Sequence, residues 1–570
     1  MTGNPAAIVI LGQGSLAVAR TVQAVLPGAS VYGLSGRVDG ADIVYDEFGA
    51  TLRDLYLRDI PLVVMCATGI IIRSLAPLLQ NKRVEPPVLA LAEDGSAVVP
   101  LLGGLRGVNA MARQIGEALA VKPAITTTGE VRFNLALENP PAGYVLRNPA
   151  AGKKFMSDML AGETVRVDGH APWLAESRIQ RDPNGRLAIT VTPEEREPVQ
   201  DELVFHPKSV VVAVAGGLQK ANLAEQVQAA LSAAGLAKSS VVMVLAGETF
   251  AADGQIHAVA AALGCPLRLV MGADKPEQLV GMSIASPVKS FNFNDNISLS
   301  VASSPESVRW LGRPRGRLAV IGLGPGAAEL MAPAVREELR RTQDIIGYET
   351  YVTMAGPFRP DQTIHPSDNR VEMDRARHAF SLAAQGRHVT VVSSGDPGVF
   401  AMAAAVIEAL HESDNPSWHG VEMAILPGIS AAQAAASRAG APLGHDFCII
   451  SLSDNLKPWD VILNRLDHAA AADLAMAFYN PISKARPWQL GQALDVVRKH
   501  RAPETPVVLG RDIGRPAERL RVTTLGEVTP DQVDMRTVVI IGSSHTRTFA
   551  KPDGGVWVYS PRWYGEKPDK

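Results

Sequence analysis

Residues 320–330 read VIGLGPGAAEL, and the fold of the second half of the chain depends on how this stretch is interpreted. A β-branched apolar run leads into Gly322, Gly324, Pro325 and Gly326, and alanine-rich sequence of helical character follows. The spacing G-x-G-x-x-A is typical of the turn between a strand and a helix in dinucleotide-binding domains. The alternative is a glycine turn that serves another ligand.

The same spacing occurs a second time, at residues 12–17. A dinucleotide site also needs an acidic residue at the end of the next strand, about 20 residues further on. After the first turn the next strand ends at Ser35, and after the second Asp344 stands on the entry side of the strand. Pro325 further lacks the N–H group that a pyrophosphate would use at a helix start. These observations disfavour a nicotinamide-dependent oxidoreductase and leave the first loop as a tight turn of unknown purpose.

Composition limits the class of protein. A chain of 570 residues exceeds a single core of about 250–300 residues, so we expect about three domains. A net charge of -3 provides no basic field for nucleic acid. The three cysteines, Cys66, Cys265 and Cys448, are too scattered for a disulfide framework or metal cluster, which suits a reducing cytosol. The first residues are expected to form a strand and turn, and Arg73 interrupts the most apolar stretch, so we expect no membrane span.

Short apolar runs bounded by Gly, Pro, Asn or Asp alternate with alanine- and leucine-rich stretches along most of the chain. Unbroken apolar strands followed by helices predict parallel sheets covered on both faces, and hence an α/β multidomain protein. A polar, proline- and glycine-rich segment is predicted to be a connector with some β content. The predicted divisions are 1–138, this connector at 139–207, 208–310, and 316–550 with subdomains at about 316–430 and 435–550.

A second break, ESVRWLGRPRGR at residues 306–317, holds four arginines among proline and glycine. It is predicted to be either a solvated linker or a patch that binds phosphate or carboxylate.

Three further turns follow apolar runs in the last half of the chain: SSGDPGVF at 393–400, PGISA at 427–431 and FYNP at 478–481. Ligands bind at the carboxyl ends of strands in open parallel sheets, so turns in this position are candidate binding loops. Asp396 and Pro397 are also a good pair to start a helix, with the aspartate as cap and the proline at the first helical position. Capping and ligand binding are therefore both open for Asp396.

Together these turns resemble the tetrapyrrole methylase family, in particular its members that act on carbon 17 of precorrin-3B, over about residues 316–545. The resemblance implies two α/β subdomains with S-adenosylmethionine in the cleft between them. It also implies methylation of precorrin-3B, or its cobalt form, with ring contraction to precorrin-4 in cobalamin biosynthesis, by a cytoplasmic homodimer. No resident metal is implied.

The residues that match the family's cofactor-binding motifs are Gly324, Pro325, Ser394, Gly395, Asp396, Val399, Ser430, Ala431 and Tyr479. Tyr348 and Tyr351 match positions that face the macrocycle in this family. Ring contraction needs acid–base help, for which a hydroxyl or carboxyl group within hydrogen-bond reach of the migrating bond would suffice. The candidates for this catalytic role are Tyr348, His365 and Asp454.

Methyl transfer to carbon requires mainly that the two reactants are positioned and kept from water. The acetate and propionate groups of the substrate call for basic residues at the edge of the cleft. Each candidate is either a carboxylate ligand or an ordinary surface charge. The candidates are His365, Arg370, Arg375, Arg377, Lys457, Lys484 and Arg486.

The front half resembles the cobalt-precorrin-5A hydrolase family, whose N-terminal part matches residues 66–129 and whose C-terminal domain matches 208–310 more faintly. Leu105 stands where the family has a histidine, and Val108 replaces a small residue. The C-terminal turn also lacks the family's cysteine. Because leucine cannot transfer a proton, the resemblance implies a binding or scaffold role, with retained hydrolysis as the alternative. A third hypothesis, a binding or channelling protein without chemistry, predicts that the later cofactor turns have lost their glycines.

Overall fold

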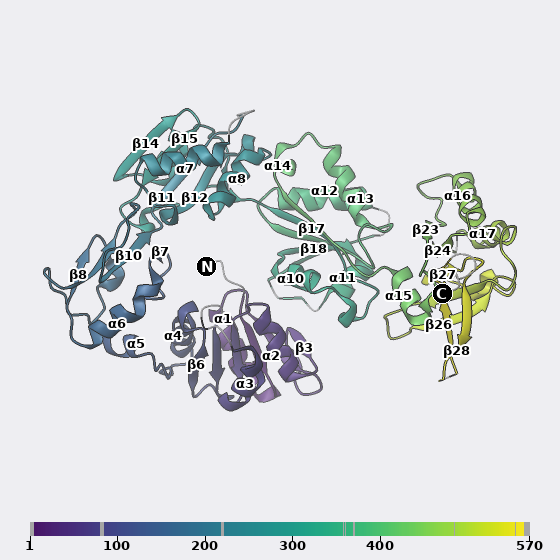
Figure 1. Cartoon of the computed structure of the whole chain (residues 1–570), viewed down its shortest axis with the longest axis horizontal. Helices are drawn as coiled ribbons and strands as arrows, with labels where there is room; N and C mark the ends of the chain where they lie inside the picture. The colour runs from purple at the N-terminus through teal and green to yellow at the C-terminus, as the bar shows by residue number, and fades with distance from the viewer. Residues whose placement is uncertain are drawn as a thin grey trace, which may run out of the picture.

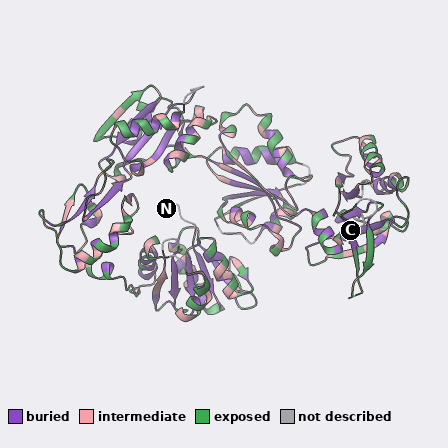
Figure 2. Cartoon of the chain, in the orientation of Figure 1, coloured by how far each residue is buried: buried purple, intermediate pink, exposed green. Residues whose placement is uncertain are grey.

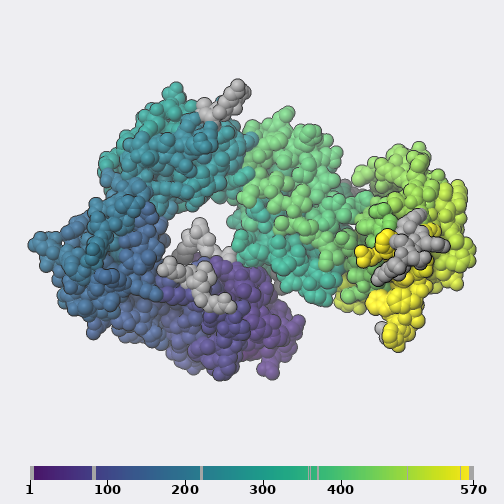
Figure 3. Space-filling view, viewed as in Figure 1, coloured from purple at the N-terminus to yellow at the C-terminus, as the bar shows by residue number. Residues whose placement is uncertain are grey.

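The computed structural model describes residues 5–79, 82, 85–217, 222–356, 358–359, 361–368, 371–483, 485–552 and 554–563. Its strands form six sheets that follow one another along the chain. In Figure 1 the first four sheets and their helices surround a central opening, and the C-terminal sheets lie outside it. The space-filling view shows the same opening (Figure 3). Within the described ranges, no helix is long and apolar enough to cross a membrane.

The first sheet has the order β3-β2-β1-β4-β5-β6, and all its pairs are parallel except β5 with β6. Both faces are covered by helices, as the unbroken apolar strands predict. The strands are β1 Ala7–Ile10, β2 Ser30–Leu34, β3 Ile43–Tyr45, β4 Leu62–Met65, β5 Val88–Leu91 and β6 Val98–Leu102. The helices are α1 Leu16–Val25, α2 Phe48–Leu57, α3 Thr68–Leu75 and α4 Val108–Ala118, followed by α5 Thr128–Phe133.

Residues 139–207, predicted to be a connector with some β content, form a complete four-stranded sheet of order β7-β10-β9-β8 with its own apolar core. Trp173 packs between Tyr144 and Phe205 in that core. The polar composition of this segment gave no signal for a complete sheet, because its apolar strands are short and are separated by long charged turns. The elements are β7 Tyr144–Leu146, α6 Gly152–Leu160, β8 Val165–Asp168, β9 Leu187–Val191 and β10 Glu202–Pro207.

The third sheet has the order β14-β15-β11-β12-β13-β16, with β14, β15 and β16 antiparallel to their neighbours. Its strands are β11 Val210–Val214, β12 Val241–Gly247, β13 Leu267–Val270, β14 Lys289–Asn294, β15 Ile297–Val301 and β16 Arg313–Pro314. Its helices are α7 Leu223–Ala233, α8 Gly254–Leu263 and α9 Pro276–Ser283.

The arginine-rich segment 306–317 is neither a solvated linker nor an open anion site. Its strand β16 pairs with β13, and Arg313 donates two hydrogen bonds to Glu248, at 3.0 and 2.7 Å. Arg315 donates to the carbonyl of Gly420 at 3.0 Å. Arg317 pairs with two carboxylates of the following sheet. The arginines therefore fix the third sheet to the fourth, because their carboxylate and carbonyl partners lie on both sides of the junction.

The fourth sheet is fully parallel, with the order β19-β18-β20-β17-β21. One face packs on α12 and α13, and the other packs on α10 and α11. Figure 2 shows the resulting buried strands between partly exposed helices. The strands are β17 Arg317–Gly322, β18 Asp344–Tyr348, β19 Thr363–Ser367, β20 His388–Ser393 and β21 Glu422–Leu426. The helices are α10 Pro333–Arg341, α11 Glu349–Ala355, α12 Glu372–Ala383, α13 Met402–His411 and α14 Pro416–His419.

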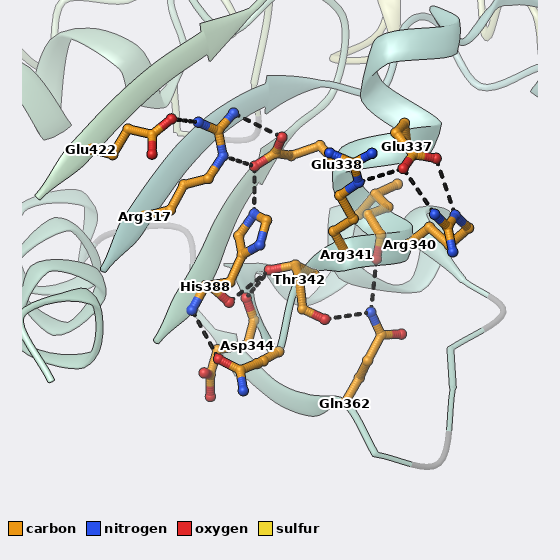
Figure 4. Close-up of polar contacts among 12 residues, drawn as sticks. Arg317, Glu337, Glu338, Arg340, Arg341, Thr342, Asp344, Gln362, His388 and Glu422 are labelled. Atoms are coloured by element: carbon orange, nitrogen blue, oxygen red, sulfur yellow. Dashed lines mark hydrogen bonds and ion pairs between the residues drawn. The ribbon is translucent and has the colours of Figure 1, made fainter. Parts of the chain in front are cut away.

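A polar network closes the amino end of this sheet, opposite the candidate loops (Figure 4). Arg317 donates two hydrogen bonds to the buried Glu338, at 2.8 and 2.9 Å, and also pairs with Glu422. His388 Nε2 lies 2.6 Å from the same Glu338 carboxylate. Burial alone would raise the pKa of Glu338, but the hydrogen bonds from His388 and Arg317 outweigh it and lower the pKa to about 2. Nearby, Glu337 of α10 lies 3.8 Å from Arg58 at the end of α2, which joins the first sheet to the fourth.

The last large sheet, of order β23-β24-β27-β25-β26, has a single parallel pair, β23 with β24. The prediction of parallel sheets is wrong for β25, β26 and β27, since the short loops between them contain no crossover α-helix and so return the chain antiparallel. A small sheet of order β22-β29-β28 completes the chain. The elements are α15 Ala431–Ala439, β22 Gly440–Ala441, β23 Phe447–Ser451, α16 Trp459–Ala471, β24 Ala475–Tyr479, α17 Gln489–Arg498, β25 Pro506–Arg511, β26 Arg519–Thr524, β27 Thr537–Ile541, β28 Arg547–Ala550 and β29 Val556–Tyr559.

Candidate functional site

Two of the candidate loops join at the carboxyl edge of the fourth sheet. The loop after β17 and the loop after β20 exchange two backbone hydrogen bonds, from Gly324 N to Gly395 O at 3.1 Å and from Gly395 N to Gly324 O at 2.8 Å. Both glycines have positive φ angles, 73° and 67°, which residues with a side chain rarely adopt. The two turns therefore form one rigid unit whose geometry depends on these glycines.

The third loop, after β21, packs directly on the first two. A Cβ atom on Gly428 would lie 2.2 Å from the carbonyl oxygen of Gly395 and 2.6 Å from that of Gly322. A Cβ on Gly322 would lie 2.4 Å from the Gly395 oxygen. These glycines are thus required because three backbones meet, and the loops after β17, β20 and β21 form a continuous edge.

Asp396 connects the second loop to the third. Its carboxylate accepts hydrogen bonds from Gly398 N at 2.8 Å and from Gly428 N at 3.1 Å. Helix α13 begins only at Met402 and has Ala401 as its N-cap, without a side-chain cap. The capping interpretation of Asp396 is therefore wrong: the side chain holds two loops together and places one carboxylate at the candidate site.

The fourth loop comes from a different sheet, the one of order β23-β24-β27-β25-β26. Ser430 starts α15 with a reciprocal capping box, in which it accepts from Gln433 N at 3.4 Å and its own N–H donates to the Gln433 side chain at 3.1 Å. Tyr479, at the end of β24, accepts a hydrogen bond from Ala432 N at 2.8 Å. Burial raises the pKa of the Tyr479 phenol, so the hydroxyl is neutral. Tyr479 thereby joins the sheet that contains β24 to the start of α15, beside Ala431.

Arg515 closes the other side of this arrangement. It lies after β25, and its Nε donates to the carbonyl of Pro325 at 3.3 Å. The ring of Pro325 also sits against Gly514, where a Cβ would be 2.9 Å from it. The first glycine loop is therefore held between the two subdomains, and Gly326 leaves room for the Arg515 side chain, which a Cβ would approach to 2.7 Å.

Of the three catalytic candidates, Tyr348 alone lies at the carboxyl edge of the fourth sheet. It ends β18, beside the strand that carries the Asp396 loop, and its ring packs edge-on against Tyr351 at 5.3 Å. His365 is mid-strand in β19, and its Nε2 lies 2.9 Å from Asp344 at the opposite, entry end of β18. This placement argues against a catalytic role for His365, because its ring is turned away from the loops.

Asp454 follows β23 in the second subdomain and forms an ion pair with Arg486 at 2.7 Å. The hydrogen bond from Arg486 lowers the pKa of the Asp454 carboxyl. Asp454 is therefore ionised near neutral pH, where it can accept a proton but has none to donate.

Most of the basic candidates for substrate carboxylates are already engaged. Arg375 is buried and donates to Ser367 Oγ at 2.8 Å and to Asp368 O at 2.6 Å, so it is neither a surface charge nor a free ligand. Arg377 pairs with Asp374 on its own helix. Arg486 donates to Ser453, Asp454 and Asn455, and so braces the loop after β23. Arg370 and Lys484 lie outside the described residues, which leaves Lys457 as a described candidate without a polar partner.

Sequence reasoning assigned no role to Phe400. Its φ of 52° is left-handed, which is strained for a bulky residue, and its side chain is 51% exposed. The ring lies 5.6 Å from that of Tyr479 and 5.7 Å from Lys457 Nζ, both in the second subdomain. The available signal in the sequence was an aromatic residue three positions after the Gly-Asp-Pro turn.

The donor set fits S-adenosylmethionine better than a nucleotide phosphate. The nine residues carried over to the cofactor include one carboxylate, Asp396, and no lysine or arginine. Ser394 has a hydroxyl without a hydrogen-bond partner among the described residues, and Pro325 offers no N–H group. A carboxylate, carbonyl groups and a phenol suit a ligand that carries a sulfonium and an ammonium group, because each of these is a cation.

The front half has a separate cavity of about 300 Å³ at the carboxyl ends of β4 and β5, lined by Cys66, Thr68, Leu91, Glu93 and Val99 among others. Burial raises the pKa of the Cys66 thiol to about 11, so the thiol is protonated at neutral pH.

The motif that carries Leu105 lies at the opposite edge of the same sheet. It follows β6, which runs antiparallel to β5, and Arg106 pairs there with Asp59, which precedes β4. Asn109 is buried and donates to Thr127 at 2.9 Å and to Glu130 at 2.6 Å. The retained asparagine thus anchors the chain after α4, and the histidine that is missing would lie away from the cavity. The corresponding C-terminal turn falls partly on 218–221, outside the described residues.

Two family models match the chain. The model for tetrapyrrole (corrin/porphyrin) methylases matches residues 317–529. The model for the N-terminal region of cobalamin synthesis protein G matches residues 50–130.

Individual relatives match the second half of the chain. A precorrin-3B C(17)-methyltransferase from Sinorhizobium sp. is 51% identical over 249 residues, which cover 44% of this chain and 97% of that protein. The cobalamin biosynthesis protein CobIJ of Mycobacterium bovis is 51% identical over 255 residues, so the chain spans about half of its length, 49%. The crystal structure of the methyltransferase CobJ is 51% identical, with a TM-score of 0.41, and covers 43% of this chain and 100% of that one.

Proposed function

Since the chain belongs to the tetrapyrrole (corrin/porphyrin) methylase family, we propose that it transfers a methyl group to carbon 17 of precorrin-3B and contracts the macrocycle to precorrin-4. The observation that carries this proposal is the assembly of four loops from two sheets around Gly324, Gly395, Asp396 and Tyr479. The intact glycines argue against a binding protein that has lost its cofactor turns.

The cofactor S-adenosylmethionine supplies an electrophilic methyl group. The chain's own residues would bind and orient it. The Asp396 carboxylate would bind a cationic group of the cofactor, and the turns after β17 and β20 would line the site with backbone atoms. Tyr479 provides an aromatic wall from the second subdomain. Orientation in such a site contributes up to about 7–11 kcal/mol to lowering the barrier, so a rigid loop unit is the main catalytic requirement.

Acid–base help for ring contraction is proposed to come from Tyr348 or Asp454. Tyr348 offers a phenolic proton at the edge of the fourth sheet, and the ionised Asp454 is the candidate proton acceptor. Replacing Tyr348 by Phe should then slow ring contraction more than methyl transfer. The two steps are followed by different signals: mass spectrometry reports the added methyl group, and the absorption spectrum reports ring contraction, because a rearrangement changes the macrocycle without changing its mass.

The decisive experiment gives the purified chain methyl-labelled S-adenosylmethionine with either metal-free precorrin-3B or its cobalt form. We expect label in a ring-contracted product from one form in preference to the other, which also identifies the physiological substrate. Absence of labelled product from both forms would refute the proposed function.

A homodimer in the cytoplasm is the proposed state of the chain. The hairpin of β28 and β29 carries the exposed aromatic side chains Phe549, Trp557 and Tyr559, which would be covered in a dimer. Sedimentation of the wild-type chain should give twice the monomer mass, and Phe549→Glu should shift it towards the monomer. A monomeric wild type at micromolar concentration would contradict this state.

The front half is proposed to bind a tetrapyrrole intermediate without hydrolysing it. The cavity at the carboxyl ends of β4 and β5 supports binding, and Leu105 in the place of a histidine argues against proton transfer by the family's route. The test incubates the full chain, without S-adenosylmethionine, with cobalt-precorrin-5A. We expect no lactone opening by mass spectrometry, whereas full turnover would establish the alternative, a bifunctional enzyme.

A further inference from the structure

Lys457 is unusual among the charged side chains near the methyl-transfer site. It is half-buried and, among the described residues, has no hydrogen bond or ion pair. Its ammonium group instead lies 5.7 Å from the centre of the Phe400 ring, across the boundary between the subdomains. A cation held only against an aromatic face is stabilised modestly, so it is available to an incoming anion.

A second cation lies close enough to interact with Lys457. Burial and the charge of Arg465 on α16 together lower the pKa of Lys457, and Arg465 is itself exposed and without an ion pair in the described part of the chain. The acidic residue of the first turn of α16, Asp460, forms no ion pair with either cation. Two like charges without a counter-ion repel each other, and a bound carboxylate would relieve that repulsion.

The loop that carries Lys457 is positioned in advance. Arg486 fixes Ser453, Asp454 and Asn455 by hydrogen bonds of 3.1, 2.7 and 2.8 Å. Pro458 follows Lys457 and caps α16, so both flanks of the lysine are restrained. A ligand therefore meets an ammonium group whose backbone is already ordered, which lowers the entropy cost of binding.

The neighbouring surface is apolar. Leu456 is 99% exposed, and Phe400 exposes half of its side chain although its backbone is in a strained conformation. Apolar side chains next to unpaired cations match a flat, apolar ring with carboxylates on its rim, which is the chemistry of a tetrapyrrole.

We propose that Lys457, with Arg465 as a second cation, binds a carboxylate of the tetrapyrrole substrate, and that Phe400 holds the Lys457 ammonium at the boundary between the subdomains until the substrate arrives. This inference rests on the proposed function, because the substrate class comes from it. It selects one residue from the basic candidates and adds Arg465 and Phe400, neither of which the sequence singled out.

The kinetic test compares Lys457→Met, Lys457→Arg and the wild type with precorrin-3B as substrate. We expect Lys457→Met to raise KM for the tetrapyrrole about tenfold, with kcat and the Kd for S-adenosylmethionine within twofold of wild type. Lys457→Arg should restore most of the KM, and Arg465→Met should raise KM in the same direction. The matched control is Lys499→Met, which removes an exposed lysine at the end of α17 and should change nothing.

Ionic strength gives a second signature. KM of the wild type should rise with added salt, and the rise should be smaller in Lys457→Met because one screened charge is gone. An unchanged KM and an unchanged salt dependence in Lys457→Met would overturn the proposal.

A labelling experiment keeps the inference separate from the proposed activity. The full chain is treated briefly with an amine-acylating reagent, with and without precorrin-3B, and modified lysines are read by mass spectrometry. We expect the substrate to protect Lys457 and not Lys499. If the wild type forms no methylated product, the proposed function fails, yet protection of Lys457 would still support the proposed binding of a substrate carboxylate by Lys457. Acylation of Lys457 at the same rate with and without substrate would refute carboxylate binding by Lys457, even if the enzyme is active.

Discussion

Gly428→Ala should disable the methyl-transfer site without unfolding the chain. The new Cβ would lie 2.2 Å from the carbonyl oxygen of Gly395 and 2.6 Å from that of Gly322, although real Cβ atoms essentially never approach closer than 3.0 Å. One of the backbones must therefore move by about 0.8 Å. Both obstacles are main-chain atoms next to the buried strands β20 and β17, so they cannot rotate away as a flexible side chain would.

The displacement falls on the turn that carries Asp396 and Phe400. A shift of about 1 Å in a positioning loop costs on the order of 100-fold in rate, so we expect kcat/KM for methyl transfer to fall about 100-fold. Overpacking of this kind destabilises by about 1–3 kcal/mol, which thermal unfolding measures. The Kd for S-adenosylmethionine, measured by calorimetry, should also rise.

Gly491→Ala is the matched control, because it makes the same substitution in the same half of the chain. The nearest atom to its Cβ would be Pro530 Cγ at 3.8 Å, an ordinary contact, and Gly491 lies in helix α17. We expect unchanged kinetics and a stability gain of about 0.5–1 kcal/mol. If Gly428→Ala shows wild-type kcat/KM and wild-type cofactor affinity, the claim that packing of the three loops sets the site geometry is refuted.

Three other substitutions test different parts of the structure. Asp396→Asn removes the charge and leaves one oxygen to accept from either Gly398 N or Gly428 N, which bind different carboxylate oxygens in the wild type. It should weaken S-adenosylmethionine binding about tenfold by calorimetry; an unchanged Kd would show that the charge is not needed for cofactor binding. Arg515→Met removes the hydrogen bond to Pro325 O and should lower kcat/KM about tenfold with little change in melting temperature. Unaltered kinetics would show that this contact between the subdomains does not position the first glycine loop. Glu338→Gln should cost up to about 3 kcal/mol at pH 7, because the folded-state pKa of about 2 lies below the ordinary 4.5. Because the folded-state pKa is lowered, this stabilisation is present above pH 4.5 and is lost as the pH falls towards 2. The difference in free energy of unfolding between wild type and variant, measured by chemical denaturation, should therefore become smaller over that range. A difference that stays constant would contradict the assignment.

The sequence predicts local structure well where one strand and one turn decide it. The apolar runs before Gly322, Ser394 and Tyr479 are strands, and the turns after them lie at carboxyl strand ends as expected. Asp344 likewise begins its strand, which is why a dinucleotide interpretation fails. These features follow from β-branched runs and glycine turns, which are properties of short segments.

Features that depend on distant partners could not be predicted. Asp396 fits a helix cap by its neighbours in sequence, but Gly428, 32 residues away, supplies one of its partners. Arg375 has the composition of a surface charge, yet the fold buries it against Ser367 and Met402. The antiparallel strands β25 and β27 have the same apolar pattern as parallel strands, because both types of strand are apolar when they are buried on two faces.

The two loops with G-x-G-x-x-A spacing show why the motif alone had so little meaning. In the first, neither Gly12 nor Gly14 has a positive φ angle, and a Cβ on either would meet nothing within 4 Å. In the second, Gly322 is closed in by two other loops and Gly324 needs its left-handed backbone. Identical spacing therefore reflects a structural requirement in one loop and none in the other. The second loop differs from the first because Gly395, Gly428 and Arg515 pack around it. The function of a glycine motif is therefore indicated by the residues that contact it and not by its spacing.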